Sequence, residues 1–253
     1  MLKFRSEPDQ ASPLVVQLLS RRKGPILLGV AIVAACGVLA LVPEIDLVPE
    51  RYFFTGGGFV GDTALGRLAR DLARTIPFFI LAALTFAWLA GKMGIVARFA
   101  PRGRSLLWLA LSLALGPGLI VSGLKDISHR PRPVQLKQFG GMHDFRPYYR
   151  FDGGCRRNCS FPSGEASAAF WTLAPASLAP PPLRLAATGA AVMFGLAAGG
   201  LRLAFGGHFV SDVFFAGILT LGVGLGLHRL VMPRRRRAGL EKHRGAGPQP
   251  RKE

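Results

Sequence analysis

Long apolar runs separated by short polar stretches dominate the chain between residues 25 and 232. A helix needs about 20 residues to cross roughly 30 Å of hydrocarbon. A soluble bundle of buried helices is the alternative, but a small soluble core does not need so many nearly uncharged runs. The pattern therefore predicts an all-α integral membrane protein with about six transmembrane helices, at residues 25–42, 76–96, 105–124, 163–179, 185–203 and 209–232.

Proline and glycine mark two special points within these runs. Gly116-Pro117-Gly118 lies inside the third run and predicts a bend there, because proline removes a helical hydrogen bond. Pro180-Pro181-Pro182 follows the fourth run and is expected to end it. We expect an N-terminal segment at 1–24, one membrane domain at 25–232 and a basic, disordered tail at 233–253.

The chain carries a formal net charge of +18, although only 18% of its residues are charged. A soluble protein has about 25% charged residues, so the low fraction agrees with membrane insertion. The positive balance indicates anionic partners. No nucleic-acid-binding fold is readable, so lipid headgroups and phosphorylated substrates are the expected anions and nucleic acid is not an expected partner.

Short loops rich in Lys and Arg usually stay in the cytoplasm. The loop between the third and fourth runs is also basic, yet an even alternation of helices puts it outside, and we attribute its charge to a binding site. The pattern predicts a multi-pass inner-membrane protein with cytoplasmic termini and a periplasmic site. The basic residues that set this orientation are Lys3, Arg5, Arg21, Arg22, Lys23, Lys92, Arg98, Arg102, Arg104 and the run 234–237.

Three polar clusters stand at the predicted outer ends of the last four helices. One runs from Lys125 to Arg132-Pro133, the second is Pro162-Ser163-Gly164-Glu165, and the third holds Arg202, His208 and Asp212. Because all three lie on one membrane face, we expect them to form one site.

The residue types in these clusters suit a phosphate group. Cationic side chains stabilise the charge on phosphate oxygens in transfer, and Lys125, Arg132 and Arg202 are three such cations. Ser163 and Gly164 open a predicted helix, where free N–H groups and the helix dipole favour an anion.

His208 and Asp212 are four residues apart and would share one face of a helix. An Asp behind a His fixes its tautomer and stabilises the imidazolium. A histidine held in this way is a good nucleophile or base.

These residues resemble the motifs of the type 2 phosphatidic acid phosphatase superfamily, whose fold is shared with the vanadium haloperoxidases. The family pattern is Lys, six residues, Arg-Pro; then Pro-Ser-Gly-His; then Ser-Arg, five residues, His, three residues, Asp. The resemblance covers residues 105–232, and the first two predicted helices match only in hydropathy. It rests on Lys125, Arg132, Pro133, Pro162, Ser163, Gly164, Arg202, His208 and Asp212.

The resemblance implies a phosphatase that acts on a membrane lipid through a phosphohistidine. His208 would attack phosphorus, Asp212 would orient it, and no metal or other cofactor would be needed. The phosphate oxygens would be held by Lys125, Arg132, Ser163, Gly164 and Arg202.

Two positions depart from the family pattern. Leu201 replaces a Ser, and Glu165 replaces the His that helps to protonate the leaving oxygen. Glu165 can act as that acid only if it is protonated when needed; otherwise it pairs with Arg132 or Arg202. A protein that binds or transports phosphorylated lipid without turnover, and a phosphotransferase with the same intermediate, are the alternatives.

The stretch from Cys155 to Glu165 is similar to the lipid A phosphatase-like branch of the superfamily. Undecaprenyl pyrophosphate and phosphatidic-acid-type lipids are the other candidate substrates. Cys155 and Cys159 lie in a predicted outer loop, where an oxidising compartment permits a disulfide, and two free thiols are the alternative. No His or carboxylate stands at ligand spacing beside them, which disfavours a zinc site.

Overall fold

The computed structural model describes residues 24–95 and 100–232. The predicted N-terminal segment and basic tail lie outside these residues, apart from Gly24. The described chain is mostly helical, with almost no strand, as the apolar pattern predicted. Its elements, in chain order, are α2 (Gly24–Leu41), η1 (Pro43–Asp46), α3 (Leu47–Phe53), β1 (Phe54–Thr55), β2 (Gly58–Phe59), α4 (Ala64–Lys92), α5 (Gly103–Leu113), η2 (Ala114–Ile120), α6 (Val121–Ser128), η3 (Pro133–Gln135), η4 (Lys137–Phe139), α7 (Gly164–Trp171), α8 (Leu173–Ser177), α9 (Pro181–Ala204) and α10 (Val210–Val231).

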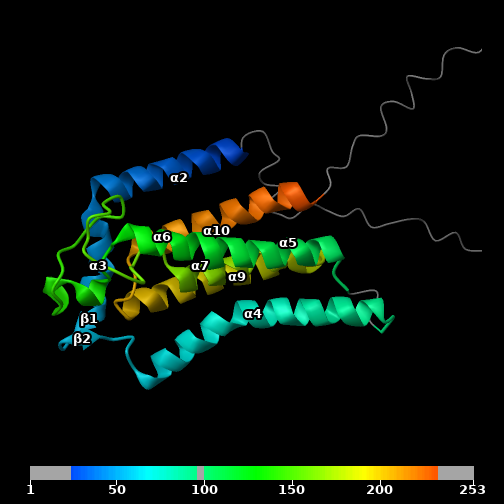
Figure 1. Ribbon diagram of the computed structural model, residues 1–253, viewed down its shortest axis with the longest axis horizontal. Helices are drawn as coiled ribbons and strands as arrows, with labels where there is room; N and C mark the ends of the chain where they lie inside the picture. The colour runs from blue at the N-terminus through cyan, green and yellow to red at the C-terminus, as the bar shows by residue number, and fades with distance from the viewer. Residues whose placement is uncertain (1–23, 96–99, 233–253) are drawn as a thin grey trace, which may run out of the picture.

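The long helices lie side by side along one direction (Figure 1). Four described helical segments are long and apolar enough to cross a membrane, and a fifth span is possible if α2 and the bent segment after it count as one. The outer surface of the bundle is apolar, because Val33, Phe79, Phe86 and Leu185 are all more than 70% exposed. Exposing so much apolar surface to water is unfavourable, whereas contact with the hydrocarbon of a membrane is favourable. The fold is that of an all-α membrane protein.

The predicted helix at 163–179 is two short helices, α7 and α8. Pro175 has no N–H to donate to the carbonyl of Trp171, and the helix breaks at Thr172, between these two residues. Together the two helices carry the chain along the bundle to the start of α9 (Figure 1), but neither is by itself long enough to count as a membrane-spanning helix. Instead α7 lies in the centre of the bundle and contacts α9 and α10, with Ala166 and Ala169 fully buried.

Helix α4 begins at Ala64 rather than at residue 76. Thr63 caps it, since its hydroxyl accepts a hydrogen bond from the Gly66 N–H at 3.0 Å. The early turns contain several arginines, so a prediction based on hydropathy places them in a loop. The structure puts Arg70 and Arg74 on the helix.

The third predicted helix is α5, η2 and α6 in continuous succession. The segment η2 is π-helical and contains Pro117. A π-helical turn leaves room for a residue that cannot donate to the regular ladder. The Gly-Pro-Gly triplet therefore distorts the helix without ending it.

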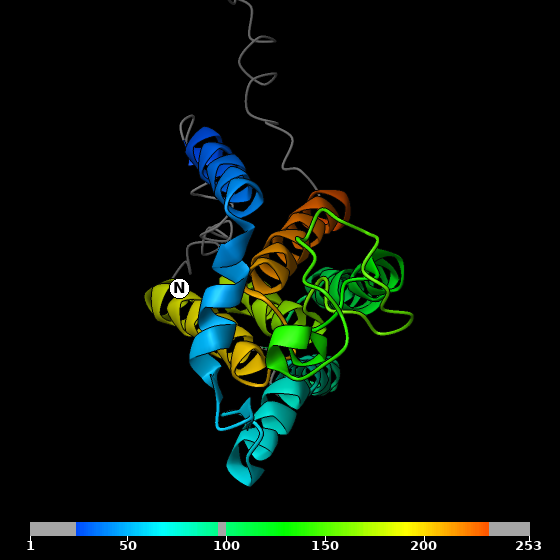
Figure 2. The ribbon, with the colours of Figure 1, turned by 90° about the vertical axis from the view of Figure 1, so that its left-hand side faces the viewer.

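Short elements cover the end of the bundle that carries the predicted site. Helix α3 turns by 93° from α2 and crosses the helix ends, together with the loop from α6 to α7 (Figure 2). An apolar cluster packs beneath it, made of Leu47, Phe59, Leu136, Phe139 and Phe209. A second cluster, Trp108, Leu109, Leu113 and Trp171, joins α5 to α7 inside the bundle.

Candidate active site

A cavity between α4, the α5–α6 helix, α7 and α9 brings the three polar clusters together. Its empty volume is about 1460 Å³, which includes the part of the cavity that is open to solvent. Ser163 and Asp212 are fully buried and are not among the lining residues. The other predicted phosphate-site residues all line it: Lys125, Arg132, Gly164, Glu165, Arg202 and His208.

His208 lies in the loop before α10, not on a helix face shared with Asp212 as the spacing suggested. Its Nδ1 is 2.7 Å from the Ser160 carbonyl oxygen and 3.5 Å from Asp212 Oδ2. A carbonyl oxygen can only accept, so Nδ1 carries the proton and Nε2 of the neutral ring keeps its lone pair. Burial lowers the pKa of His208 to about 3, although the nearby Asp212 opposes this shift.

Asp212 approaches His208 because its carboxylate turns back over the start of α10. It accepts hydrogen bonds from the Phe209 N–H at 2.9 Å and from Arg130 Nη1 at 2.6 Å. The Ser160 hydroxyl donates to the same carboxylate. With these partners, a fully buried carboxylate is held in one orientation behind the histidine.

Sequence reasoning missed the buried ion network behind this pair. Arg130 is only 1% exposed, donates from Nη2 to Asp46 Oδ2 at 2.7 Å and lies 4.1 Å from the centre of the Phe209 ring. Asp46 also accepts from the Ser211 N–H at 2.7 Å. Removing one partner would leave an uncompensated buried charge, so the network holds the first turn of α10 in place.

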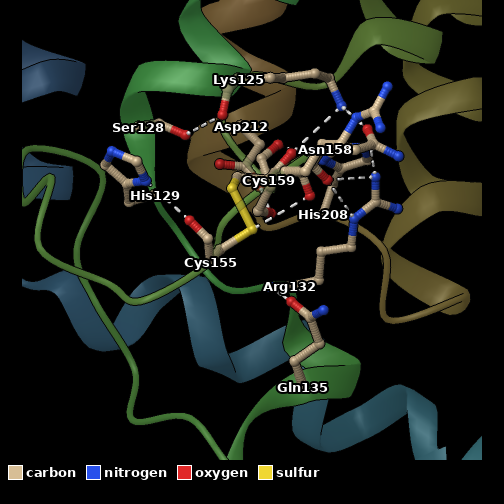
Figure 3. Close-up of a disulfide and its surroundings, with 12 residues drawn as sticks. Lys125, Ser128, His129, Arg132, Gln135, Cys155, Asn158, Cys159, His208 and Asp212 are labelled. Atoms are coloured by element: carbon tan, nitrogen blue, oxygen red, sulfur yellow. Dashed lines mark hydrogen bonds and ion pairs between the residues drawn. A yellow bond between two sulfur atoms is a disulfide. The ribbon is translucent and has the colours of Figure 1, made fainter.

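Lys125 and Arg132 are held by Asn158, another residue that the sequence did not single out (Figure 3). Arg132 Nη2 donates to the Asn158 carbonyl oxygen and to its Oδ1, both at 3.0 Å. Lys125 Nζ is 3.5 Å from the same Oδ1. Asn158 has a left-handed backbone with φ of 51° and lies inside the ring closed by a disulfide between Cys155 and Cys159.

Ser163 is the N-cap of α7, as expected of a Ser before a helix. Its side chain accepts from the Ala166 N–H at 3.4 Å, and its N–H donates to the Asp212 carbonyl at 3.1 Å. This leaves the backbone at Gly164 facing the cavity. A Cβ at Gly164 would lie 3.6 Å from Lys125 Cε, an ordinary contact, so the fold alone does not require glycine there.

Arg202 and Glu165 face each other across the cavity wall. Arg202 Nε lies 3.6 Å from Glu165 Oε2. Within the described chain, Nε and Nη1 of Arg202 have no hydrogen-bond partner although both are buried. Gly207 packs against the Arg202 guanidinium so closely that a side chain there would collide with it. The guanidinium is thus fixed in place with donors to spare.

The fold and this site define a membrane enzyme that acts on phosphate groups. The chain belongs to the PAP2 superfamily, whose family model matches residues 105–236. It is 35% identical over 202 residues to a lipid A 4'-phosphatase of Francisella tularensis subsp. novicida, covering 77% of this chain and 90% of that protein. It is also 31% identical to one of Rhizobium leguminosarum, with 75% and 88% covered.

A third relative, the lipid A 4'-phosphatase of Rhizobium etli, is 33% identical, with 75% of this chain and 80% of that protein covered. No solved structure matches the chain significantly. The resemblance to the superfamily, and to its lipid A phosphatase-like branch, is confirmed. The protein is a membrane lipid phosphatase.

Proposed function

We propose that the protein removes a phosphate from a lipid A-type glycolipid at the periplasmic face of the inner membrane, through a phosphohistidine on His208 and without a metal. The relatives named above support the lipid class. One observation carries the mechanism. His208 lines a cavity between Lys125, Arg132 and Arg202, with its Nδ1 engaged by the Ser160 carbonyl.

The reaction would run in two displacements. Nε2 of His208 attacks phosphorus and forms an N–P bond while the P–O bond to the lipid breaks. The leaving oxygen takes its proton from Glu165. Water then attacks the phosphohistidine and gives its proton to the Glu165 carboxylate, and inorganic phosphate leaves with Nε2 restored. In each displacement the three cations would hold the oxygens on which charge develops.

The donor set supports a reaction without metal. Cations take the places that face the phosphate, and Glu165 is the carboxylate among the described residues that line the cavity. In the described part of the chain, no three His, Cys, Asp or Glu side chains are grouped so that they could hold a metal ion. Phosphate release should therefore persist when the purified protein is assayed in a chelator.

The decisive experiment traps the intermediate. Wild-type protein in detergent, given lipid A with a radiolabelled 4'-phosphate and quenched rapidly, should retain label that is stable in alkali and lost in acid, as expected of a phosphoramidate. His208→Ala should carry no label and release no phosphate, whereas His143→Ala, at a partly buried loop position that does not line the cavity, should behave as wild type. Labelled His208→Ala protein would overturn the mechanism.

The same experiment separates the alternatives. A binder without turnover would retain unchanged lipid and release no phosphate. A phosphotransferase would form the labelled intermediate but pass the label to a second lipid rather than to water.

A further inference from the structure

Two arginines outside the family motifs line the same cavity. Arg70 and Arg74 reach it from the early turns of α4, whereas Lys125, Arg132 and Arg202 line it from other parts of the chain. They are four residues apart and therefore on one face of the helix. They stand on α4 only because that helix starts at Ala64.

The cavity carries more positive charge than one phosphate needs. Lys125, Arg132 and Arg202 supply three positive charges, which already cover a phosphate monoester of about −2 at neutral pH whether Glu165 is protonated or ionised. Arg70 and Arg74 come in addition to these cations.

The two arginines are only partly neutralised by the protein. Asp71 Oδ1 lies 3.3 Å from Arg70 Nη2 and 3.8 Å from Arg74 Nη2, so one carboxylate is shared between two guanidinium groups. Within the described chain, Nε of Arg70 is buried without a hydrogen-bond partner. Arg70 also lies over the Phe205 ring at 5.4 Å, which holds its guanidinium in position.

The same face of α4 becomes apolar deeper in the bundle. Phe78 and Leu81 follow Arg70 and Arg74 at helical spacing, and they line the cavity together with Leu113 of α5. One continuous cavity thus presents the catalytic cations, a second pair of cations and an apolar wall. A ligand that fits it is an amphiphile with two anionic groups.

We propose that Arg70 and Arg74 bind a second phosphate of the same lipid substrate and so select bisphosphorylated over monophosphorylated lipid. This rests on the proposed function, because it assumes that the reacting phosphate sits beside His208. The two arginines would act on recognition and not on the chemical step.

The test compares two substrates in neutral detergent micelles. One is a lipid A disaccharide carrying two phosphates, and the other carries only the 4'-phosphate. The double variant Arg70→Gln, Arg74→Gln should lower kcat/KM for the bisphosphorylated lipid by about 10- to 100-fold, because charge-assisted hydrogen bonds are lost. For the monophosphorylated lipid kcat/KM should change by less than about 3-fold, within the range of context effects.

Arg67→Gln is the matched control. Arg67 stands on the same helix, is ion-paired with Asp62 at 2.6 Å and is not among the lining residues. This variant should leave the preference between the two lipids unchanged. The assay is repeated in phosphatidylglycerol vesicles, since a bilayer lipid could offer the same phosphate chemistry.

An equal loss on both lipids would overturn the proposal, and so would no loss on either. A loss seen only in vesicles would assign the arginines to bilayer headgroups and would also overturn it. If wild-type protein hydrolyses neither lipid, the proposed function fails. Binding of the two lipids to His208→Ala protein, with and without the arginine substitutions, still decides whether Arg70 and Arg74 recognise the second phosphate.

Discussion

In the proposed mechanism His208 must be neutral to attack phosphorus, and its buried surroundings favour the neutral imidazole. Burial lowers the pKa of its imidazole to about 3. A group with a pKa this low is unprotonated throughout the range in which an ordinary histidine, with a pKa near 6.5, gains its proton. We therefore expect kcat/KM to show no acid limb from His208 between pH 5 and 8, after the substrate's own ionisation near pH 6 is divided out.

The measurement is a kcat/KM profile from about pH 4.5 to 8.5 with the substrate pKa determined separately. A remaining loss of activity with a midpoint near 6.5 would show that His208 titrates like an exposed imidazole. That result would contradict its burial behind Ser160.

Glu165 is one of the two positions where the chain departs from the family pattern, and it lines the cavity. If it protonates the leaving oxygen, Glu165→Gln should lower kcat by about 10²–10⁴-fold, because the amide cannot deliver a proton. Glu165→His restores the usual family residue and should retain substantial activity. Steady-state kinetics of both variants give the comparison.

The structure also offers a second interpretation of Glu165. Its carboxylate lies 3.6 Å from Arg202 Nε, so it could serve mainly to tune that cation. In that case Glu165→Gln would change KM and leave kcat at saturation intact. An unchanged kcat therefore rules out the acid role.

The site residues that could be read from the sequence are those with a fixed spacing to one another, such as Lys125 with Arg132 and His208 with Asp212. Arg130, Asp46 and Asn158 could not be read in this way. Asp46 is far along the chain from its partner Arg130, and it sits among other loop carboxylates. Only the folded structure shows that Asp46 is buried and paired with Arg130.

At the scale of elements, the small loop closed by Cys155 and Cys159 positions two cations. Asn158 within it contacts Arg132 and Lys125. Such a short ring stabilises the fold by only about 2 kcal/mol, so its main effect falls on geometry. We expect Cys155→Ser, Cys159→Ser to lower kcat/KM by about 10-fold, and the same loss when wild-type protein is reduced.

Two variants distinguish the loss of the Asn158 contacts from unspecific effects of cysteine substitution or reductant. Asn158→Gly tolerates the left-handed backbone and removes only the side-chain contacts, so it should cost about 5- to 10-fold in kcat/KM. Cys36→Ser, in α2, removes the free cysteine and should match wild-type protein both without reductant and with it. Full activity of the reduced wild-type protein would show that the ring does not position Asn158.

The elements themselves were predictable where hydropathy and helix coincide, as in α2, α9 and α10. The prediction was wrong where a helical stretch is charged or where an apolar run does not form one helix. The early turns of α4 are helical but charged, because Thr63 caps the helix well before the apolar run begins. In α7 and α8 the run is apolar, but Pro175 divides it, and the bundle rather than lipid surrounds α7.

At the scale of the whole molecule, the cavity and the described chain ends lie at opposite ends of the bundle. Helix α2 begins, and α10 finishes, at the end away from α3 and α6 (Figure 1). The basic residues Arg21, Arg22 and Lys23 precede α2, and a further basic run follows α10. Because short basic flanks stay in the cytoplasm, the cavity should open to the periplasm.

Reporter fusions test this orientation. Green fluorescent protein fused after Arg237 should fluoresce, and alkaline phosphatase at the same place should be inactive. Alkaline phosphatase fused after Gly57, in the hairpin at the cavity end of the bundle, should be active because only α2 then crosses the membrane. The reverse pattern at both sites would place His208 in the cytoplasm, where it would meet the lipid before export. The phosphatase chemistry would survive that outcome, but its substrate would be the inner-leaflet lipid.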